Sequence, residues 1–372
     1  MNPLERKIIN MIKTEGPLTF EKFMSVALYD KEYGYYVKEK TRIGREGDFF
    51  TSPHLHPVFG IMIGKQIEEM WELLGNPDDF SLIEMGPGTG YVCKDMLDYL
   101  KKRELFKSLK YFIVELSSST RDRQKDLLSE FSDKIRWVDS LNDIGEVRGC
   151  IFSNELLDAF PVHLVRMDDS LNEIYVDIID SKFVEREGQP GTKALAEYFT
   201  EFAIEPERGY TTEVNLKIRD WLKDINNILK EGFILTIDYG YPAWEYYNED
   251  RNRGTLMCYH RHQWNEDPLI NIGEQDITAH VNFSAVSKWG KENSFETIGY
   301  CSQGTFLVSL GIDEEIRRLA SDSEDYLSEL TRIKRLILPQ GMGESHKVLI
   351  QYKGDKIMKL KGFTIRNKVS SL

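Results

Sequence analysis

Short apolar runs alternate with amphipathic segments through the first half of the chain. The runs predict buried strands, and the segments between them, with apolar residues three and four positions apart, predict helices. The predicted strands lie at 81–84, 111–115, 135–138 and 150–152, and the predicted helices at 57–74, 92–105 and 118–131. This alternation is typical of an α/β fold with a doubly wound, mostly parallel sheet. We therefore expect a Rossmann-like core.

The alternation of strands and helices is interrupted by a predicted hairpin and then resumes. Residues 163–180 predict a β-hairpin, and a helix at 216–229 with a strand at 233–237 returns to the α/β rhythm. We expect N-terminal helices and a lid-like loop over 1–56, and a core made of 57–160, 213–240 and 305–352. The insertions 161–212 and 241–304 would form a second subdomain on the substrate side.

A glycine-rich turn follows the first predicted strand, in the stretch Ser81–Gly90 (SLIEMGPGTG). Glycines let the backbone approach a ligand, and the helix that begins near Tyr91 offers unpaired N–H groups. This order predicts a site for a nucleotide-like cofactor, with Gly86, Gly88 and Gly90 in its loop. The same pattern also occurs in ordinary turns.

Glu115 ends the second predicted strand, where a carboxylate can accept hydrogen bonds from both hydroxyls of a ribose. Nicotinamide dehydrogenases share this arrangement, but their loop has the form G-x-G-x-x-G. Here Glu84 opens an E-x-G-x-G-x-G pattern, which favours an S-adenosylmethionine methyltransferase, since no pyrophosphate has to be cradled. Glu84 could order water or meet the methionine ammonium of the cofactor.

Polar side chains also follow the fourth predicted strand, in the stretch Ser153–Pro161 (SNELLDAFP). Asn154 lies at the strand end, and Glu155 and Asp158 would share a face if the segment turns helically. Two carboxylates there predict a cationic substrate group, for which a guanidinium is the natural match. The alternative is that Asn154 and Asp158 only cap the turn.

Composition narrows the class of protein. With 372 residues, 41% hydrophobic content and a net charge of −13, the chain predicts a folded globular protein that does not bind nucleic acid as its main partner. No apolar run is long enough to predict a membrane span, and the amphipathic N-terminal stretch lacks the pattern of an export signal. Four scattered cysteines fit free thiols, so we expect a cytoplasmic location.

Other candidate functional residues have weaker support from the sequence. The pairs His54–His56 and His260–His262 lack a cysteine or carboxylate at ligand spacing, so we predict no metal site. Asp276 and His280 lie four positions apart and could form a carboxylate-oriented base on a helical turn. The alternative is an interaction that only fixes the insertion.

Eight motifs follow one another along nearly the whole chain: GDFFTSPHLHPVFG, EMGPGTG, SNELLDAFP, DYG, GTLMCYHRH, DITAHVNFS, SQGTFLVSLGI and GMGESHKVL. Together they resemble the MidA family of S-adenosylmethionine-dependent methyltransferases. The mitochondrial members of that family are complex I assembly factors that methylate arginine.

The resemblance implies a class I methyltransferase fold that binds S-adenosyl-L-methionine through the glycine loop and Glu115. It matches Asn154, Glu155, Asp158 and Pro161 to the family's strand-four motif, and it assigns to the substrate side Asp238, Asp276, Thr278 and His280. Two departures are Thr89, where many members carry arginine, and 208–215, which keeps only Glu213 of an acidic pattern. Both concern the substrate more than the cofactor.

We therefore predict a methyltransferase that modifies an arginine nitrogen of a partner protein, which could be a subunit of a respiratory complex. The expected cofactor-binding residues are Glu84, Gly86, Gly88, Gly90, Glu115 and Asn154, and the expected catalytic residues are Glu155, Asp158, Asp276 and His280. The alternatives are a non-catalytic assembly factor that binds the cofactor, and a nicotinamide-dependent oxidoreductase.

Overall fold

A computed structural model of the chain describes residues 1–38, 52–323 and 325–372. The chain divides into two compact units. The first, which we call the hairpin unit, comprises Met1–Phe49, Leu157–Asp220 and Tyr241–Val286. The second, the sheet unit, comprises Phe50–Leu156, Trp221–Gly240 and Ser287–Leu372.

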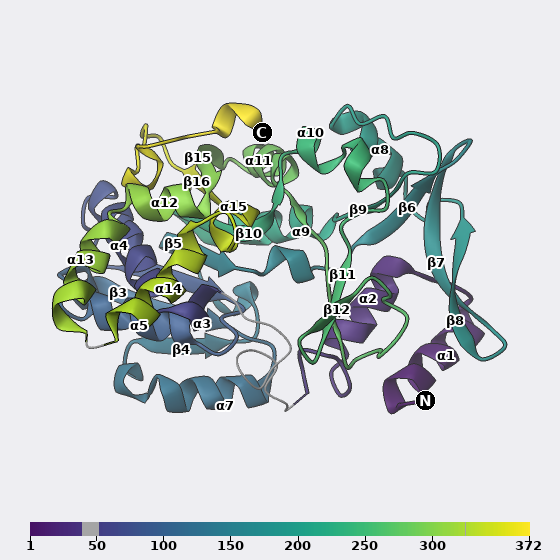
Figure 1. The fold of residues 1–372 in the computed structure, drawn as a ribbon, viewed down its shortest axis with the longest axis horizontal. Helices are drawn as coiled ribbons and strands as arrows, with labels where there is room; N and C mark the ends of the chain where they lie inside the picture. The colour runs from purple at the N-terminus through teal and green to yellow at the C-terminus, as the bar shows by residue number, and fades with distance from the viewer. Residues whose placement is uncertain (39–51, 324) are drawn as a thin grey trace. The chain divides into compact units, whose positions relative to one another are not determined.

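The sheet unit is built on strands in the order β15-β16-β10-β5-β2-β3-β4 (Figure 1). Their bounds are β2 (Phe80–Met85), β3 (Leu109–Val114), β4 (Ile135–Val138), β5 (Val147–Asn154), β10 (Leu229–Tyr241), β15 (Glu296–Ser302) and β16 (His346–Lys353). The strands from β10 to β4 pair in parallel, whereas β16 runs antiparallel to both β10 and β15. The predicted mostly parallel, Rossmann-like sheet is confirmed.

Helices cover the sheet because its strands are apolar on both faces, as parallel strands usually are. The helices are α3 (Ser52–Leu55), α4 (Val58–Leu73), α5 (Tyr91–Leu100), α6 (Leu105–Ser108), α7 (Ser118–Leu127), α12 (Gln303–Ser309), α13 (Ile312–Asp322), α14 (Tyr326–Ile337) and α15 (Met342–Ser345). One core packs α4, α5, α12 and α14 against alternate residues of the strands, such as Leu82, Phe152 and Leu235. Two further helices, α9 (Lys217–Ile228) and α11 (Phe283–Glu292), each contribute residues to both units.

Three central strands approach one another closely at the end remote from their carboxyl termini. Ser81 of β2, Gly149 of β5 and Gly232 of β10 lie side by side in the register of the sheet. A Cβ on Gly149 would lie 1.9 Å from the Ser81 carbonyl oxygen, and one on Gly232 would lie 2.0 Å from the Gly149 carbonyl oxygen. Any side chain at either position would therefore push these strands apart.

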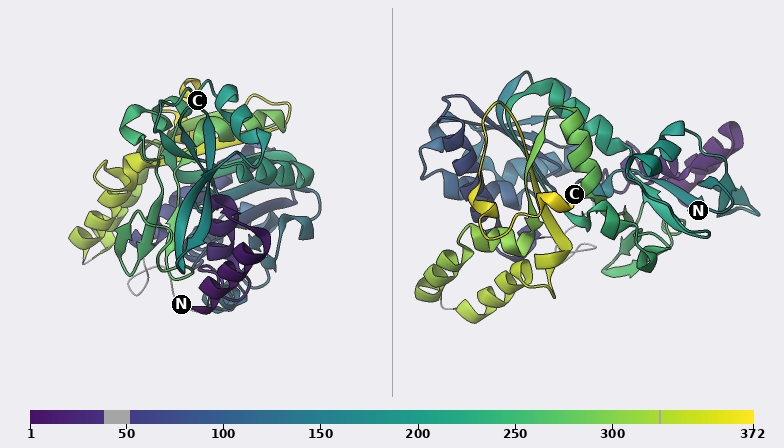
Figure 2. Two further views of the ribbon diagram at one scale, coloured as in Figure 1. Left: turned by 90° about the vertical axis from the view of Figure 1, so that its right-hand side faces the viewer. Right: turned by 90° about the horizontal axis from the view of Figure 1, so that it is seen from above.

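The C-terminal segment after β16 folds back onto the edge strand β15 and is drawn in yellow in Figure 2. The Lys368 N–H donates to the Tyr300 carbonyl at 2.7 Å, and the Asn367 side chain accepts from the Tyr300 N–H at 3.2 Å. These bonds satisfy backbone groups that an exposed edge would otherwise present to another chain.

The hairpin unit contains a sheet in the order β1-β7-β6-β9, in which β8 pairs with β7, and a smaller sheet in the order β12-β11-β13. The strands are β1 (Leu18–Thr19), β6 (His163–Met167), β7 (Leu171–Ile179), β8 (Lys182–Gly188), β9 (Thr211–Val214), β11 (Met257–His260), β12 (Gln263–Asn265) and β13 (Asp276–Thr278), whereas β14 (Val281–Asn282) pairs with β10 of the large sheet. The helices are α1 (Pro3–Glu15), α2 (Phe20–Tyr29), α8 (Lys193–Glu201) and α10 (Ala243–Tyr246). The predicted hairpin corresponds to β6 and β7.

Local sequence explains where the first two helices begin. The Asn2 side chain accepts from the Glu5 N–H at 2.8 Å while the Glu5 carboxylate accepts from the Asn2 N–H at 2.6 Å, which is a reciprocal capping box. The Thr19 side chain caps α2 by accepting from the Lys22 N–H. The apolar faces of both helices join one core with β6, β7, β11 and β13.

Several predicted boundaries differ from the observed elements. The insertion expected to reach residue 304 ends earlier, because β15 belongs to the large sheet. The helix expected over 92–105 is interrupted between α5 and α6. Part of the predicted lid-like loop falls on 39–51, outside the described residues.

Candidate functional site

The glycine loop joins β2 to α5, and its three glycines all have positive φ. The values are 62° at Gly86, 57° at Gly88 and 85° at Gly90. Residues with a Cβ adopt this left-handed region only at a cost, which explains why the sequence alternates glycine here. Gly86 donates its N–H to the Val114 carbonyl at 3.0 Å, so the loop is tied to the end of β3.

The loop can hold a cofactor for two structural reasons. Gly90 is the N-cap residue of α5, a ten-residue helix whose first N–H groups lack partners within the helix. Glu115 follows β3, the neighbour of β2 in the sheet, and thus lies at the same edge as the loop. A glycine-rich loop beside an acidic group suits the ribose and amino-acid portions of S-adenosyl-L-methionine.

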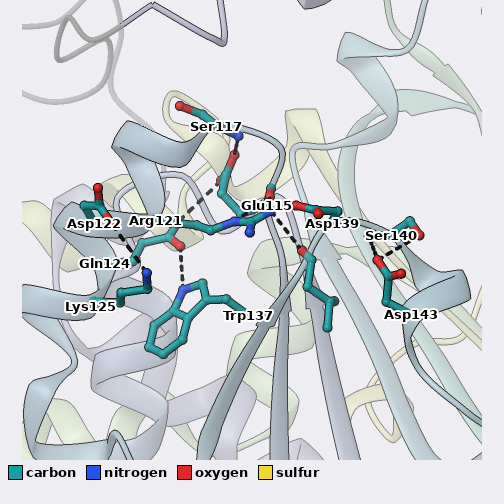
Figure 3. A network of polar contacts seen from close by, with 11 residues as sticks. Glu115, Ser117, Arg121, Asp122, Gln124, Lys125, Trp137, Asp139, Ser140 and Asp143 are labelled. Atoms are coloured by element: carbon teal, nitrogen blue, oxygen red, sulfur yellow. Dashed lines mark hydrogen bonds and ion pairs between the residues drawn. The ribbon is translucent and has the colours of Figure 1, made fainter. Parts of the chain in front are cut away.

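The Glu115 carboxylate is held at both oxygens (Figure 3). Oε1 accepts from the Ser117 N–H at 2.9 Å, and Oε2 accepts from Nε2 of Gln124 at 3.3 Å. Burial raises the pKa of Glu115, although the hydrogen bonds from Ser117 and Gln124 act in the opposite direction. The main-chain oxygen of Glu115 accepts from Nε of Arg121 at 2.9 Å.

Glu84 lies in β2, two residues before Gly86, and not in the glycine loop itself. Its side chain is buried, and Oε2 accepts from the Tyr111 hydroxyl at 2.7 Å. Burial raises the pKa of Glu84 to about 7. The contact between Glu84 and the cofactor stays a prediction. The contact between Glu84 and Tyr111 of β3 is present in the structure of the sheet unit.

Glu155 follows β5 with a φ of 49°, a conformation that is uncommon for a residue with a side chain. Its N–H donates to the Ile237 carbonyl at 2.8 Å, and the next N–H, of Leu156, donates to Asp238 at 3.1 Å. The surrounding strands therefore hold this turn in place. Gly86 leaves room for it, because a Cβ there would lie 3.0 Å from Cδ1 of Leu156.

The Glu155 carboxylate lies among polar groups of the sheet unit. Its Oε1 accepts from the Asn154 side chain at 3.3 Å and from the Ser52 N–H at 3.4 Å, and it lies 3.6 Å from Nε2 of His346. The side chains of Glu155 and His346 are only 12% and 8% exposed. Oδ1 of Asn154 and Nε2 of His346 are buried and make no hydrogen bond among the described residues.

The predicted helical face shared by Glu155 and Asp158 is wrong. Glu155 has positive φ, and the 3₁₀ turn η3 begins only at Leu157. Asp158 belongs to the hairpin unit, where its side chain is buried and its carbonyl accepts from the Ala279 N–H at 3.0 Å. The two carboxylates therefore do not form the pair that a helical spacing would give.

The predicted helical turn linking Asp276 to His280 is also wrong, because Asp276 begins strand β13. Its Oδ1 accepts from the Tyr36 hydroxyl at 2.7 Å. The His280 ring packs against Tyr241 with ring centres 5.4 Å apart, and the main-chain N–H of His280 donates to the Thr255 hydroxyl at 3.0 Å. Asp276 and Asp158, both buried, raise the pKa of Tyr36 further, after the larger effect of its own burial.

The remaining substrate-side residues have identifiable structural contacts. Asp238 is buried and accepts from the Tyr239 N–H as well as from Leu156, so it supports the Glu155 turn. The Thr278 hydroxyl donates to the Met257 carbonyl at 3.3 Å. Glu213 accepts hydrogen bonds from Thr255, Leu256 and Tyr246.

Sequence reasoning missed several residues around the site. His346 lies in the quoted motif GMGESHKVL, yet nothing in its spacing shows that β16 brings it to Glu155. Gln124 lies on the predicted helix after Glu115 but gives no local signal. Leu116, 64% exposed directly after Glu115, offers apolar surface that a cofactor's base could cover.

Three further observations concern metals, thiols and membranes. No group of three His, Cys, Asp or Glu side chains within 1–38, 52–323 and 325–372 could hold a metal ion. The four cysteines are free and buried, which confirms the prediction of free thiols. In the part of the chain that the structure describes, no helix has the length and apolarity needed to cross a bilayer.

Comparison with known proteins agrees with this geometry. A family model described as "putative S-adenosyl-L-methionine-dependent methyltransferase" matches residues 62–301. The mitochondrial protein arginine methyltransferase NDUFAF7 homolog of Caenorhabditis elegans is 30% identical, over 87% of this chain and 80% of the relative. Its human counterpart is 26% identical, over 92% of this chain and 82% of the relative. A Burkholderia thailandensis protein bound to S-adenosyl-homocysteine has a TM-score of 0.91 at 31% identity, covering 99% of this chain and 96% of that one.

The fold and the glycine loop thus define a class I methyltransferase. The chain belongs to the family of S-adenosyl-L-methionine-dependent methyltransferases that these comparisons identify. This confirms the predicted enzyme class and cofactor, and it decides against the nicotinamide-dependent oxidoreductase.

Proposed function

We propose that this methyltransferase modifies an arginine nitrogen of a partner protein. The relatives named above as protein arginine methyltransferases support this proposal. The observation that carries it is the Glu155 carboxylate, which is only 12% exposed and follows β5, the strand that pairs with β2 ahead of the glycine loop. A fixed carboxylate there suits a guanidinium, whose planar N–H groups bind carboxylates in a defined orientation.

The residues of the sheet unit have two roles in this proposal, binding the cofactor and orienting the substrate. The glycine loop and Glu115 would hold S-adenosyl-L-methionine, which supplies an electrophilic methyl group when it is bound. Glu155 would orient the attacking nitrogen, and a near-attack separation of about 3 to 3.5 Å makes orientation the main requirement. Its Oε2 makes no hydrogen bond among the described residues, so this oxygen is the one assigned to the substrate and to the proton that the nitrogen releases.

In the hairpin unit, Asp158, Asp276 and His280 stay candidates for contact with the substrate protein. Tyr36 joins them because its hydroxyl binds Asp276 directly. The partner could be a respiratory-complex subunit, as the family resemblance suggests. The buried free thiols fit a reducing compartment such as the cytoplasm.

The test is to incubate purified protein with methyl-labelled S-adenosyl-L-methionine and a lysate of the source organism. Labelled proteins are then hydrolysed and the labelled amino acid is identified. We expect methylarginine, formed by the unaltered protein and lost in Glu155→Ala while the dissociation constant of the cofactor stays within about twofold. Label on another amino acid would reject arginine, and cofactor binding without any labelled protein would favour a non-catalytic assembly factor.

A further inference from the structure

We propose that Gln124 is a positioning residue for the cofactor, because its side-chain amide sets the glycine loop and the Glu115 carboxylate in one fixed arrangement. The inference rests on the proposed role of Glu115 in binding the ribose. No contact between Gln124 and the cofactor is required, since Gln124 acts through the loop and through Glu115.

Gln124 connects three separate elements from the buried face of α7. Figure 3 shows its contacts with Glu115 and Trp137. Its Nε2 donates to the Gly88 carbonyl at 2.8 Å and to Oε2 of Glu115 at 3.3 Å. Its Oε1 accepts from Nε1 of Trp137, on β4, at 3.0 Å. The side chain is fully buried, so water does not compete for these bonds.

The chemistry of the three contacts requires an amide. The Gly88 carbonyl and the Glu115 carboxylate are both acceptors and need two donors on one atom, whereas the Trp137 ring N–H needs an acceptor. A glutamate at this position would offer only acceptors when ionised and would repel Glu115. A leucine would fill the space and leave Gly88, Glu115 and Trp137 without their bonds.

The neighbouring cation does not replace this function. Nε of Arg121 donates to the main-chain oxygen of Glu115, and the Arg121 guanidinium pairs with Asp139. The carboxylate itself is therefore oriented by the Ser117 N–H at one oxygen and by Gln124 at the other. An acceptor fixed in this way can meet both ribose hydroxyls without reorganising when the cofactor binds.

The experiment measures dissociation constants by calorimetry for S-adenosyl-homocysteine and for its 2′-deoxyribose analogue. The ratio of the two constants reports how well Glu115 recognises the ribose. The variants are Gln124→Leu and the isosteric Gln124→Glu, which keeps the volume if the leucine variant folds poorly. The matched control is Gln66→Leu, since Gln66 is another fully buried glutamine of the sheet unit and binds Glu69 at 2.7 Å.

We expect the unaltered protein and Gln66→Leu to prefer the ribose ligand about tenfold, the factor that one well-placed hydrogen bond to a charged group supplies. Both Gln124 variants should bind S-adenosyl-homocysteine about tenfold more weakly and retain less than about threefold preference. A wild-type preference in either folded Gln124 variant would overturn the inference. An unaltered protein without any preference would instead reject the ribose role of Glu115, and the inference with it.

Discussion

Glu155 and His346 face each other across the carboxyl edge of the sheet, with Oε1 and Nε2 3.6 Å apart. They come from β5 and β16, which both pair with β10 and so lie on either side of it. The Tyr239 ring packs against the imidazole with ring centres 5.6 Å apart. The sheet order therefore brings an imidazole to the carboxylate that we assign to the substrate.

Replacing His346 with alanine should impair methyl transfer without affecting cofactor binding. The change removes the polar neighbour of Glu155 Oε1, so the carboxylate loses part of its orientation. We expect turnover to fall about tenfold, which corresponds to about 1.4 kcal/mol of transition-state stabilisation. Single-turnover kinetics and cofactor titration measure the two effects separately. His346→Gln, whose amide places an N–H donor near Glu155, should recover part of the rate, and an unchanged rate in the alanine variant would remove His346 from the mechanism.

Gly90→Ala should weaken cofactor binding because a Cβ at φ of 85° strains the start of α5. Its Cβ would meet no atom closer than 3.5 Å, so the cost comes from the backbone. That cost is about 1 to 2 kcal/mol, and relief of the strain would move the loop N–H groups. Calorimetry with S-adenosyl-homocysteine should show at least a fivefold loss of affinity, within the range that this strain predicts.

Gly16→Ala is the matched control for this change. Gly16 has a φ of 87°, has no atom within 4 Å of a built Cβ, and lies in the hairpin unit at the end of α1. Gly16→Ala should lose at least as much stability in thermal unfolding, because Gly16 combines its positive φ with a ψ of −173°, but only Gly90→Ala should bind the cofactor more weakly. Equal affinities in the two variants would show that the loop tolerates the strain without loss of function.

Glu84→Gln should change how stability depends on pH. Burial raises the pKa of Glu84 from 4.5 to about 7, so the folded state holds the proton more tightly than the unfolded state. The resulting stability is fully present below pH 4.5 and is lost as the pH rises through about 7. The glutamine variant lacks this titration, so it should gain stability relative to the unaltered protein over the same interval, by up to about 3 kcal/mol.

Denaturant unfolding of both proteins at pH 5, 6, 7 and 8 checks this prediction. The comparison isolates Glu84 because the other titrating groups are common to both proteins. Glutamine can still accept from the Tyr111 hydroxyl, so the contact with β3 is kept. A stability difference that stays constant across this range would mean that Glu84 does not titrate there.

Glu213→Ala should destabilise the hairpin unit. Glu213 is buried, and its carboxylate accepts from the Thr255 and Leu256 N–H groups at 2.9 and 3.0 Å and from the Tyr246 hydroxyl at 3.1 Å. Alanine would leave the Thr255 and Leu256 N–H groups without this acceptor, at a cost of about 3 kcal/mol. Glu213→Gln keeps one acceptor oxygen and should lose less. Thermal unfolding followed by circular dichroism gives the order, and equal midpoints for all three proteins would contradict it.

The sequence predicts where the glycine loop and Glu115 lie in the fold, because both positions depend on local chemistry. Positive φ restricts Gly86, Gly88 and Gly90 one residue at a time, and a strand end fixes where Glu115 lies. The alternation of apolar runs likewise predicts the parallel strands. These features need no information about distant parts of the chain.

The wrong predictions arise where the spacing of residues is interpreted without knowledge of the backbone conformation between them. The four-residue interval between Asp276 and His280 brings side chains together only in a helix, and the segment forms β13 instead. The contacts of Glu155 with His346 and of Glu115 with Gln124 depend on sheet order and on the packing of α7, which short motifs do not encode. The antiparallel strand β15 was missed because its pairing with β16 is equally non-local.

The contacts among Ser81, Gly149 and Gly232 limit the substitutions that proteins of this family can tolerate. These residues lie at the opposite end of β2, β5 and β10 from the glycine loop and Glu155, and they touch neither. Because the strands are rigid and paired along their length, a separation forced at that end would carry through to the loop and the Glu155 turn. Inherited variation at Gly149 or Gly232 should therefore be as damaging as variation in the loop itself, so distance from the chemistry is a poor guide to which substitutions this enzyme tolerates.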